Sequence, residues 1–398
     1  MNIQLSKRVI QIKPSPTLTV TARAQEMRRQ GKDVISLGAG EPDFDTPNHI
    51  KEAAIKAIQT GFTKYTPVDG IPSLKEAIIN KFKTFNHLDY TPDEIIVSSG
   101  GKQCIYNTYQ ALLNEGDEII IPAPYWVSYP DMALLAGAKP IIVPTTLSQN
   151  FKLTEKILEK AITPQTKIFM INSPSNPTGM AYTKSELEKL GVVLRKHPHV
   201  LIATDDMYEH ILWNNKPFVN IVNACPDLKP RTIVLSGVSK AYSMTGWRIG
   251  YAAGPKTVIQ AMKKIQGQST SNPCSISQAA AEAALRGSLD TVETMVNAFK
   301  TRHDFVVEAL NAIPGVQCAP ADGAFYAFFN VDAIIKHHPS IQNDTQLAEH
   351  LIEHAGVALV PGSAFGAPGY LRLSIATSME NLQEALKRLQ KAFSSTSS

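Results

Sequence analysis

The middle of the chain alternates short apolar runs with longer stretches of helical periodicity. Helical periodicity occurs, for example, at residues 102–113, 183–196 and 255–265. The apolar runs of strand length are residues 94–98, 117–121, 139–143, 167–171, 200–204 and 231–235. Short apolar strands that alternate with helices form mostly parallel sheets covered on both faces. This part of the chain is therefore predicted to have an α/β fold.

The pattern changes after Gly287. The remaining predicted elements are a long helix at about 289–312, an apolar segment at 324–330, a helix near 346–355, strands at 357–360 and 370–375, and a closing helix at 379–392. That order predicts a smaller α+β unit, which the first forty-odd residues would join. We expect a large domain over residues 47–287 and a small domain formed by residues 1–46 and 288–398.

Composition and charge exclude several classes of protein. The chain has 398 residues, of which 43% are hydrophobic and 19% charged, which suits a large globular core. Its net charge of +4 is spread out, so neither nucleic acid nor a membrane surface is expected as a partner. No apolar run approaches the roughly 18–20 residues of a membrane span. We expect no secretory signal, no metal site, and four reduced cysteines in a cytoplasmic protein.

The segment with the strongest chemical signal is residues 236–250, SGVSKAYSMTGWRIG. Lys240 follows a buried strand, where lost solvation lowers the pKa of an amine and lets it attack an aldehyde to form a Schiff base. Arg248 and a hydroxyl of Ser236 or Ser239 could hold a phosphate nearby. A single lysine in a Gly/Ser loop is more often a surface residue, so the prediction depends on the whole segment.

Asp205 and the glycines at 100–101 each follow a predicted strand. A side chain at the carboxyl end of a parallel strand faces the ligand crevice, where the Asp205 carboxylate could pair with a protonated ring nitrogen. A helix N-cap is the structural alternative, and the adjacent Asp206 receives no role. Gly100 and Gly101 precede a helix whose N-terminal N–H groups could bind an anion, although a plain turn would have the same sequence.

Three further residues are candidates for contacts with a ligand. Trp126 follows a turn and could stack on an aromatic ring, or pack in the core. Arg372 lies in an apolar strand and needs a partner, which could be a substrate carboxylate or an internal acid. Gly40 lies in a small-residue turn that a substrate could approach closely.

The 236–250 segment resembles the pyridoxal-phosphate attachment signature of class I and II aminotransferases at every defined position. The resemblance covers nearly the whole chain and is closest to bacterial-type aspartate aminotransferases, fold type I, subgroup Ib. It also rests on residues 38–45 (GAGEPDFD), 64–67 (KYTP), 100–103 (GGKQ), 124–130 (PYWVSYP), 172–179 (NSPSNPTG), 205–208 (DDMY) and 372–374 (RLS). It implies a large domain whose mostly parallel seven-stranded sheet lies between helices, plus the smaller α+β domain.

The resemblance implies roles for individual residues, with pyridoxal 5'-phosphate as cofactor. Lys240 would bind the cofactor covalently and act as general base, and Asp205 would pair with its ring nitrogen. The implied cofactor contacts are Gly101, Lys102, Gln103, Trp126, Asn176, Asp205, Tyr208, Ser239, Lys240, Arg248 and, from the other subunit, Tyr65. The implied substrate contacts are Gly40, Lys102, Trp126, Asn176 and Arg372. Tyr208 and Asn176 would hydrogen-bond the phenolic oxygen, and a homodimer with shared active sites follows from Tyr65.

The implied activity is transfer of the amino group from L-aspartate to 2-oxoglutarate with ping-pong kinetics. Lys102 would contact either the distal carboxylate of the substrate or the cofactor phosphate. Residues 268–273 lack the arginine that another aspartate aminotransferase subgroup uses, so prephenate, aromatic acids and alanine stay open as alternatives. A lyase or decarboxylase on the same scaffold, or a non-catalytic regulator that binds the cofactor, are the rival functions.

Overall fold

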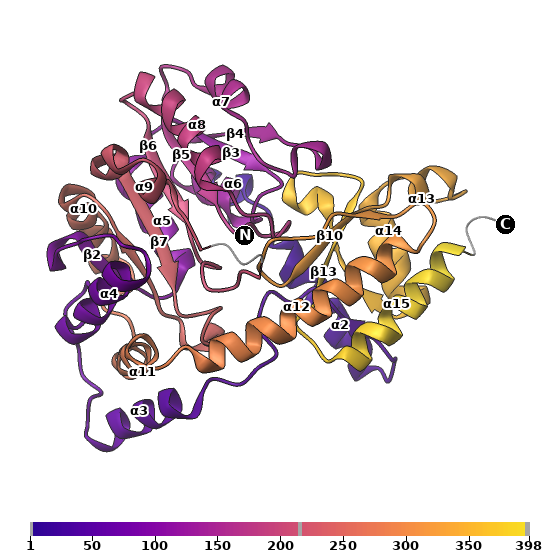
Figure 1. Ribbon diagram of the computed structural model, residues 1–398, viewed down its shortest axis with the longest axis horizontal. Helices are drawn as coiled ribbons and strands as arrows, with labels where there is room; N and C mark the ends of the chain where they lie inside the picture. The colour runs from indigo at the N-terminus through magenta and orange to yellow at the C-terminus, as the bar shows by residue number, and fades with distance from the viewer. Residues whose placement is uncertain (1–2, 214–216, 395–398) are drawn as a thin grey trace.

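A seven-stranded sheet forms the centre of the computed structural model, which describes residues 3–213 and 217–394. Its strands, in spatial order, are β2 (Ile95–Ser98), β8 (Gly250–Ala253), β7 (Thr232–Gly237), β6 (Leu201–Asp205), β5 (Thr166–Asn172), β3 (Glu118–Ala123) and β4 (Lys139–Pro144). Only β8 runs antiparallel to its neighbours (Figure 1). The prediction of an α/β fold with a mostly parallel seven-stranded sheet is therefore confirmed.

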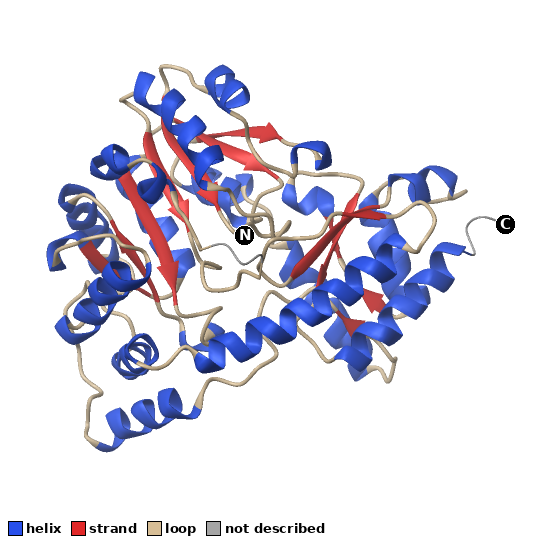
Figure 2. Cartoon of the chain, in the orientation of Figure 1, coloured by secondary structure: helices blue, strands red, loops and turns tan. Residues whose placement is uncertain are grey.

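Helices cover both faces of this sheet (Figure 2). Residues that alternate along a strand face opposite sides, so Ile119 and Ile121 pack in one cluster and Ile120 in another. The first cluster includes α5 (Gly101–Leu112), α6 (Ser128–Leu135) and α10 (Lys256–Gly267). The second includes α3 (Asn48–Gln59), α4 (Pro72–Phe85), α7 (Glu155–Ala161), α8 (Lys184–Lys196), α9 (Ile221–Ala224) and α11 (Ser275–Arg286).

The apolar runs predicted six of the seven strands and missed β8. This strand has four small or aromatic residues and begins at Gly250, the last residue of the motif at 236–250. Its first residue must be glycine, because a Cβ on Gly250 would lie 2.2 Å from the backbone nitrogen of Gly101. The strand therefore packs its backbone directly against the start of α5.

The C-terminal part has two smaller sheets. β12 (Val360–Pro361), β13 (Tyr370–Ser374), β10 (Tyr326–Asn330) and β9 (Gln317–Cys318) form one antiparallel sheet. β1 (Ile35–Ser36) pairs with β11 (Val357–Ala358) in the other. The predicted single strand at 357–360 is therefore wrong. The chain passes from one sheet to the other at Leu359, so that β11 and β12 belong to different sheets.

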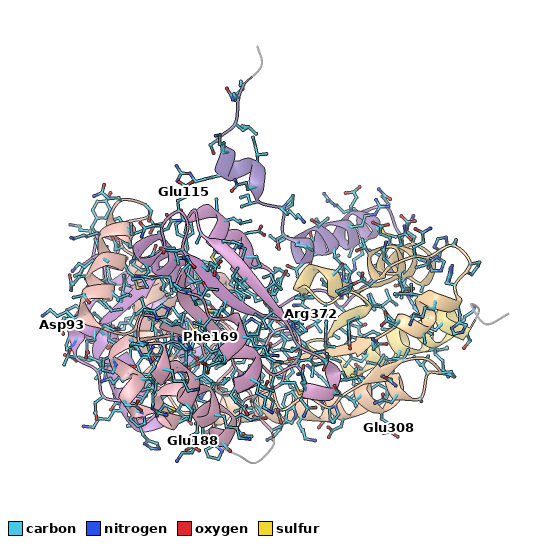
Figure 3. The ribbon with its side chains drawn as sticks, turned by 90° about the horizontal axis from the view of Figure 1, so that it is seen from above. Asp93, Glu115, Phe169, Glu188, Glu308 and Arg372 are labelled. Carbon is cyan, nitrogen blue, oxygen red and sulfur yellow. The ribbon has the colours of Figure 1, made fainter. Side chains whose placement is uncertain are left out.

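The remaining helices lie around these sheets. They are α1 (Lys7–Gln11), α2 (Pro16–Arg29), α12 (Asp290–Asn311), α13 (Asp332–His337), α14 (Asp344–His350), which continues as a π-helical turn over Leu351–Ala355, and α15 (Met379–Ser394). α12 runs from the large sheet to the smaller sheets (Figure 1), and α1 projects from the body of the molecule (Figure 3). The exact domain boundaries stay a prediction.

Within the described residues, no helix is long and apolar enough to cross a membrane. The same residues contain no group of three or more His, Cys, Asp or Glu side chains arranged to hold a metal ion.

Candidate active site

The carboxyl ends of three neighbouring strands bring the main candidate residues together. β5 ends at Asn172 and β6 at Asp205, and the two residues are register partners. Asn172 Nδ2 also donates a hydrogen bond to the Asp205 carbonyl at 2.9 Å. β7 ends at Gly237, and the next turn carries Lys240. The sheet therefore positions the aspartate and the lysine at one edge, where ligands of open α/β sheets bind.

Lys240 has the environment of a reactive amine. Its Nζ donates to the Gly40 carbonyl at 2.5 Å. Burial lowers the pKa of Lys240 to about 8, with a smaller effect of the same sign from the cations Arg372 and Arg248. Glu41 and Asp205 act in the opposite direction. A substantial fraction of this amine is therefore neutral near physiological pH, as a nucleophile or general base requires.

Asp205 is a buried carboxyl group with one strong side-chain partner. Tyr129 donates its hydroxyl to Asp205 Oδ2 at 2.6 Å, and the backbone N–H of Met207 lies 3.3 Å from Oδ1. Burial raises the pKa of Asp205 to about 6, although these hydrogen bonds oppose the shift. A cationic ring nitrogen beside this group would stabilise the ionised form. Tyr129 lies in the segment 124–130 but was not a candidate, because its contact with Asp205 joins residues 76 positions apart in the sequence.

Arg372 projects from β13 and is almost completely buried, with 1% of its surface exposed. It donates to Asn176 Oδ1 at 2.9 Å and to the Gly38 carbonyl at 2.6 Å, and both acceptors are uncharged. Its guanidinium carbon lies 4.4 Å from the centre of the Tyr326 ring, and its Nε has no partner among the described residues. The Arg372 side chain lies between the part of the molecule with the large sheet and the part with the smaller sheets (Figure 3). Among the residues that the structure describes, no carboxylate pairs with this buried cation, which fits a group that binds an external carboxylate.

Tyr208 lies next to Arg372 in this buried region. Its hydroxyl is 2.8 Å from that of Tyr326, and one of the two must donate to the other. The predicted pair of Tyr208 and Asn176 is therefore brought to one place, but each already has another protein partner. Tyr326 was not predicted from the sequence.

The turn before α5 forms a close-fitting cradle. Gly100 has a φ of 93°, and a Cβ there would lie 2.3 Å from the Arg248 guanidinium. A Cβ on Gly101 would lie 2.3 Å from Met207. The first N–H groups of α5 have no acceptor within the helix. Together with Arg248 they can therefore bind a phosphate.

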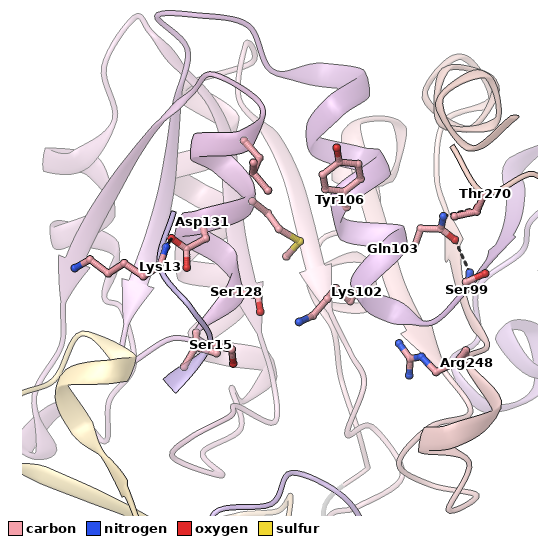
Figure 4. Close-up of a pocket in the computed structure, with 13 residues that line it drawn as sticks. Lys13, Ser15, Ser99, Lys102, Gln103, Tyr106, Ser128, Asp131, Arg248 and Thr270 are labelled. Carbon is pink, nitrogen blue, oxygen red and sulfur yellow. Dashed lines mark hydrogen bonds between the residues drawn. The ribbon is translucent and has the colours of Figure 1, made fainter. Parts of the chain in front are cut away.

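A pocket of about 450 Å³ opens beside this cradle (Figure 4). Lys102, Gln103 and Arg248 line it, together with Lys13 and Ser15 from the N-terminal segment. The Lys102 Nζ lies 5.0 Å from the Trp126 ring centre. The basic side chains make the pocket suitable for anionic groups. Neither Lys13 nor Ser15 was a candidate, since nothing near them in the sequence marks a site.

Two residues that were predicted to contact the cofactor or its phosphate have other hydrogen-bond partners in the structure. Ser236 donates its hydroxyl to Glu209 Oε1 at 2.6 Å and points into the protein core, so the suggestion that it holds phosphate is wrong. Ser239 is the remaining hydroxyl of that pair. The Gln103 side chain already accepts from the Ser99 N–H and donates to Thr270, each at 2.6 Å.

Trp126 and Tyr65 differ in how they relate to the rest of the site. Trp126 is partly buried and packs edge-on against Tyr129 with ring centres 5.3 Å apart, close to the Asp205 carboxyl. Tyr65 has 93% of its surface exposed and does not join the other candidates within this chain. Its predicted role requires a second subunit.

These residues fit pyridoxal phosphate. The Lys240 amine suits the aldehyde, the buried Asp205 carboxyl suits the pyridine nitrogen, and the glycine cradle with Arg248 suits the phosphate. Lysine, aspartate and cradle at the edge of a mostly parallel sheet define the class of fold type I pyridoxal-phosphate enzymes.

Comparisons with known proteins narrow this class. Residues 32–389 match the model of the family described as aminotransferase class I and II. An aspartate/prephenate aminotransferase from Nitrosomonas europaea is 58% identical, over 98% of this chain and 100% of that protein. The aspartate aminotransferase of Rhizobium meliloti has a TM-score of 0.95 at 48% identity, and covers 99% of each chain. That of Thermus thermophilus with maleate has a TM-score of 0.92 at 44% identity, over 98% of this chain and 100% of that one. The chain belongs to the class I and II aminotransferases, which use pyridoxal phosphate to exchange amino groups between amino acids and oxo acids.

Proposed function

We propose that this enzyme is an aspartate aminotransferase that transfers the amino group of L-aspartate to 2-oxoglutarate and gives oxaloacetate and L-glutamate. The observation that carries the proposal is a pair of cationic groups of different kinds. Arg372 is buried and has no carboxylate partner in the described part of the chain, and Lys102 lines an open basic pocket. A dicarboxylate substrate offers one carboxylate to each. The similarity to aspartate aminotransferases, one of them studied with the dicarboxylate maleate, supports this substrate class.

Each candidate residue has a separate role in the proposed reaction. Bound pyridoxal phosphate supplies the electron sink that stabilises negative charge at the substrate Cα. Arg372 holds the α-carboxylate and thereby orients the Cα–H bond. Lys240 takes the proton from the substrate Cα as a general base and donates it to a carbon of the cofactor. Asp205 keeps the ring nitrogen protonated, while Tyr208 and Asn176 donate to the phenolic oxygen.

Prephenate is the second candidate substrate. The relatives in Nitrosomonas europaea and Cereibacter sphaeroides are aspartate/prephenate aminotransferases, at 58% and 53% identity. Prephenate has two carboxylates, as 2-oxoglutarate has, and Lys13 lines the same pocket as Lys102, so the pocket presents two lysines to the distal carboxylate of either acceptor. The charges of these side chains suit both 2-oxoglutarate and prephenate.

A panel of substrates tests these assignments. Purified enzyme with pyridoxal phosphate is assayed with aspartate as donor and with 2-oxoglutarate, prephenate or pyruvate as acceptor, and the values of kcat/KM are compared. We expect the dicarboxylic acceptors to exceed pyruvate by at least about tenfold, the order of one additional charged contact. Equal values for all acceptors would contradict the proposed role of the basic pocket. Product formed without any acceptor would favour a lyase or decarboxylase, and no turnover at all would favour a regulator.

The same proposal includes a homodimer with shared sites in the cytoplasm. Tyr65 is exposed, and so are Ile55, Ile58 and Phe62 on and just after α3. A second copy would cover this apolar surface, and its Tyr65 would complete the phosphate site. The test mixes a Tyr65→Ala chain with a Lys240→Ala chain under conditions of subunit exchange. Hybrid dimers contain one intact site, so activity should rise above that of either variant alone. No rise, despite exchange, would contradict sharing.

A further inference from the structure

A buried ionic cluster formed by Lys81, Asn86 and Glu209 includes none of the residues that line the basic pocket. Lys81 of α4 pairs with Glu209, and their side chains are only 5% and 2% exposed. Asn86 bridges them, accepting from Lys81 Nζ at 2.8 Å and donating to Glu209 Oε2 at 2.7 Å. Ser236 donates to Glu209 Oε1 at 2.6 Å. Both carboxylate oxygens of Glu209 are therefore occupied.

Such a cluster is costly, since two charges lose most of their hydration when they are buried. Apolar residues of similar volume often give equal or greater stability. Burial lowers the pKa of Lys81, whereas Lys81 and the hydrogen bonds keep the pKa of Glu209 below its usual value. Stability alone therefore does not explain why an ion pair occupies this place.

The position of Glu209 in the chain suggests what the cluster does. Glu209 follows Tyr208 directly, and Ser236 lies four residues before Lys240. The carboxylate thus joins the segment that carries Asp205 and Tyr208 to the loop that carries Lys240. Asp206 anchors the first segment on its other side.

Asp206 makes this second anchor through uncharged partners. It accepts from Thr204 Oγ1 at 2.6 Å and from Asn220 Nδ2 at 2.9 Å, and its side chain is fully buried. Asp206, within the Asp205–Tyr208 segment, and Glu209, directly after it, are therefore both held in the core, while Asp205 and Tyr208 belong to the site.

We propose that Glu209, held by Lys81 and Asn86, is a positioning residue that fixes Lys240 relative to Asp205 through its hydrogen bond with Ser236. This inference rests on the proposed function for its catalytic readout. Its structural content is that one carboxylate adds a side-chain link between two segments that the backbone pairing of β6 and β7 already holds together, and that would bind opposite parts of the cofactor. Displacement by about 1 Å at a reacting group can cost up to about a hundredfold in rate.

The most selective variant is Ser236→Ala, because it leaves the ion pair of Lys81 and Glu209 in place. It removes the hydroxyl that bonds Glu209 and that also interacts with Tyr251. Replacing Glu209 or Lys81 would leave a buried unpaired charge and risk unfolding. We expect kcat with aspartate and 2-oxoglutarate to fall roughly tenfold while KM changes much less. The pH midpoint of the absorption band of the bound cofactor should move by about half a unit, since it depends on the distance of Lys240 from its charged neighbours. Ser236→Thr, which keeps the hydroxyl, should restore both.

Thr232→Val is the matched control. Thr232 begins the same strand, is equally buried, and donates its hydroxyl to the Leu228 carbonyl at 2.8 Å at the end distant from Lys240. This variant should lower the unfolding temperature without changing kcat or the spectral midpoint. If Ser236→Ala also changes only stability, the inference is wrong. If Ser236→Ala does not fold, Ser236→Cys takes its place, because a thiol is a weaker donor than a hydroxyl. Ser236→Cys must then give smaller changes in kcat and in the spectral midpoint, and unchanged values would reject the inference.

The unmodified enzyme separates this inference from the proposed function. If it binds the cofactor but does not react with aspartate, the substrate assignment fails. The spectral midpoint needs no substrate, so its shift in Ser236→Ala would still support the positioning role, and an unchanged midpoint would still oppose it.

Discussion

The two ends of the candidate site are built in opposite ways. At the buried end, Arg372, Asp205 and Tyr208 are nearly inaccessible, and each has a dedicated hydrogen-bond partner in the protein. At the open end, Lys102 and Arg248 are exposed and line a pocket of about 450 Å³. The buried end has a geometry that the protein sets by itself, whereas the open end depends on an anionic ligand to organise its cations.

This difference has a consequence for substitutions. Removal of a group at the buried end leaves its partner unsatisfied and changes a fixed geometry, so the effect should be large. Removal of a cation at the open end loses one solvent-exposed contact, which salt also weakens. The predictions below test this order.

The largest effect is expected for Lys240→Ala. Loss of the amine removes both the covalent attachment and the general base, so kcat should fall by about 10³-fold or more. Steady-state kinetics measure the loss, and absorption spectra of the purified variant should lack the band of the attached cofactor. A variant that retains the band would contradict the assignment of Lys240.

Asp205→Asn should be the next most severe change. The amide cannot balance a protonated ring nitrogen, so kcat should fall about 10²–10³-fold. Tyr129→Phe removes only the 2.6 Å hydrogen bond to this carboxyl and should have a much smaller effect. If the two variants lose the same activity, the carboxylate charge is not the important property.

Arg372→Lys should lower kcat/KM for aspartate by about 10²-fold, because an ammonium group cannot make a bidentate contact with the α-carboxylate. Arg231→Lys is the control. Arg231 also bonds backbone carbonyls, of Leu194, His197 and Val200, but at the other end of β7. The control should affect thermal stability alone, and an equal loss of kcat/KM in both variants would contradict a specific role for Arg372.

Lys102→Met should raise the KM for aspartate about tenfold and leave the KM for alanine unchanged, since only aspartate has a distal carboxylate. The exposed Lys184 of α8 provides a control, because Lys184→Met removes the same charge far from the pocket. The effect at Lys102 should shrink at high salt. A rise in KM for both amino acids would instead place Lys102 on the cofactor phosphate.

The smallest effect concerns pH. Only the neutral Lys240 amine attacks the cofactor aldehyde, so uptake of pyridoxal phosphate by the apoprotein should accelerate as pH rises through the lowered pKa of about 8. Between pH 7 and 8 the neutral fraction rises about fivefold, which sets the expected increase in rate. Absorbance after mixing measures it. A rate that keeps rising steeply to about pH 10, where an ordinary lysine titrates, would contradict the shift.

The comparison of the two ends also shows what the sequence could predict. Apolar periodicity predicted six strands of the large sheet, and the motif around Lys240 predicted the fold type and cofactor. Asp205 followed from its place after an apolar strand. Sequence patterns could not identify the roles of Tyr129 and Tyr326, because these roles come from contacts with residues far away in the sequence. Ser236 was misassigned for the same reason, since its partner Glu209 lies 27 positions earlier.

Both half-reactions of an aspartate aminotransferase with Lys240 as the attachment point can be followed in the absorption of the bound cofactor. The enzyme loaded with pyridoxal phosphate is titrated with aspartate and then with 2-oxoglutarate, while the visible absorption band is followed beside Lys240→Ala. We expect a yellow band that bleaches with aspartate and returns with 2-oxoglutarate, and no such band in the variant. A yellow band that ignores aspartate, or an identical band in Lys240→Ala, would contradict it.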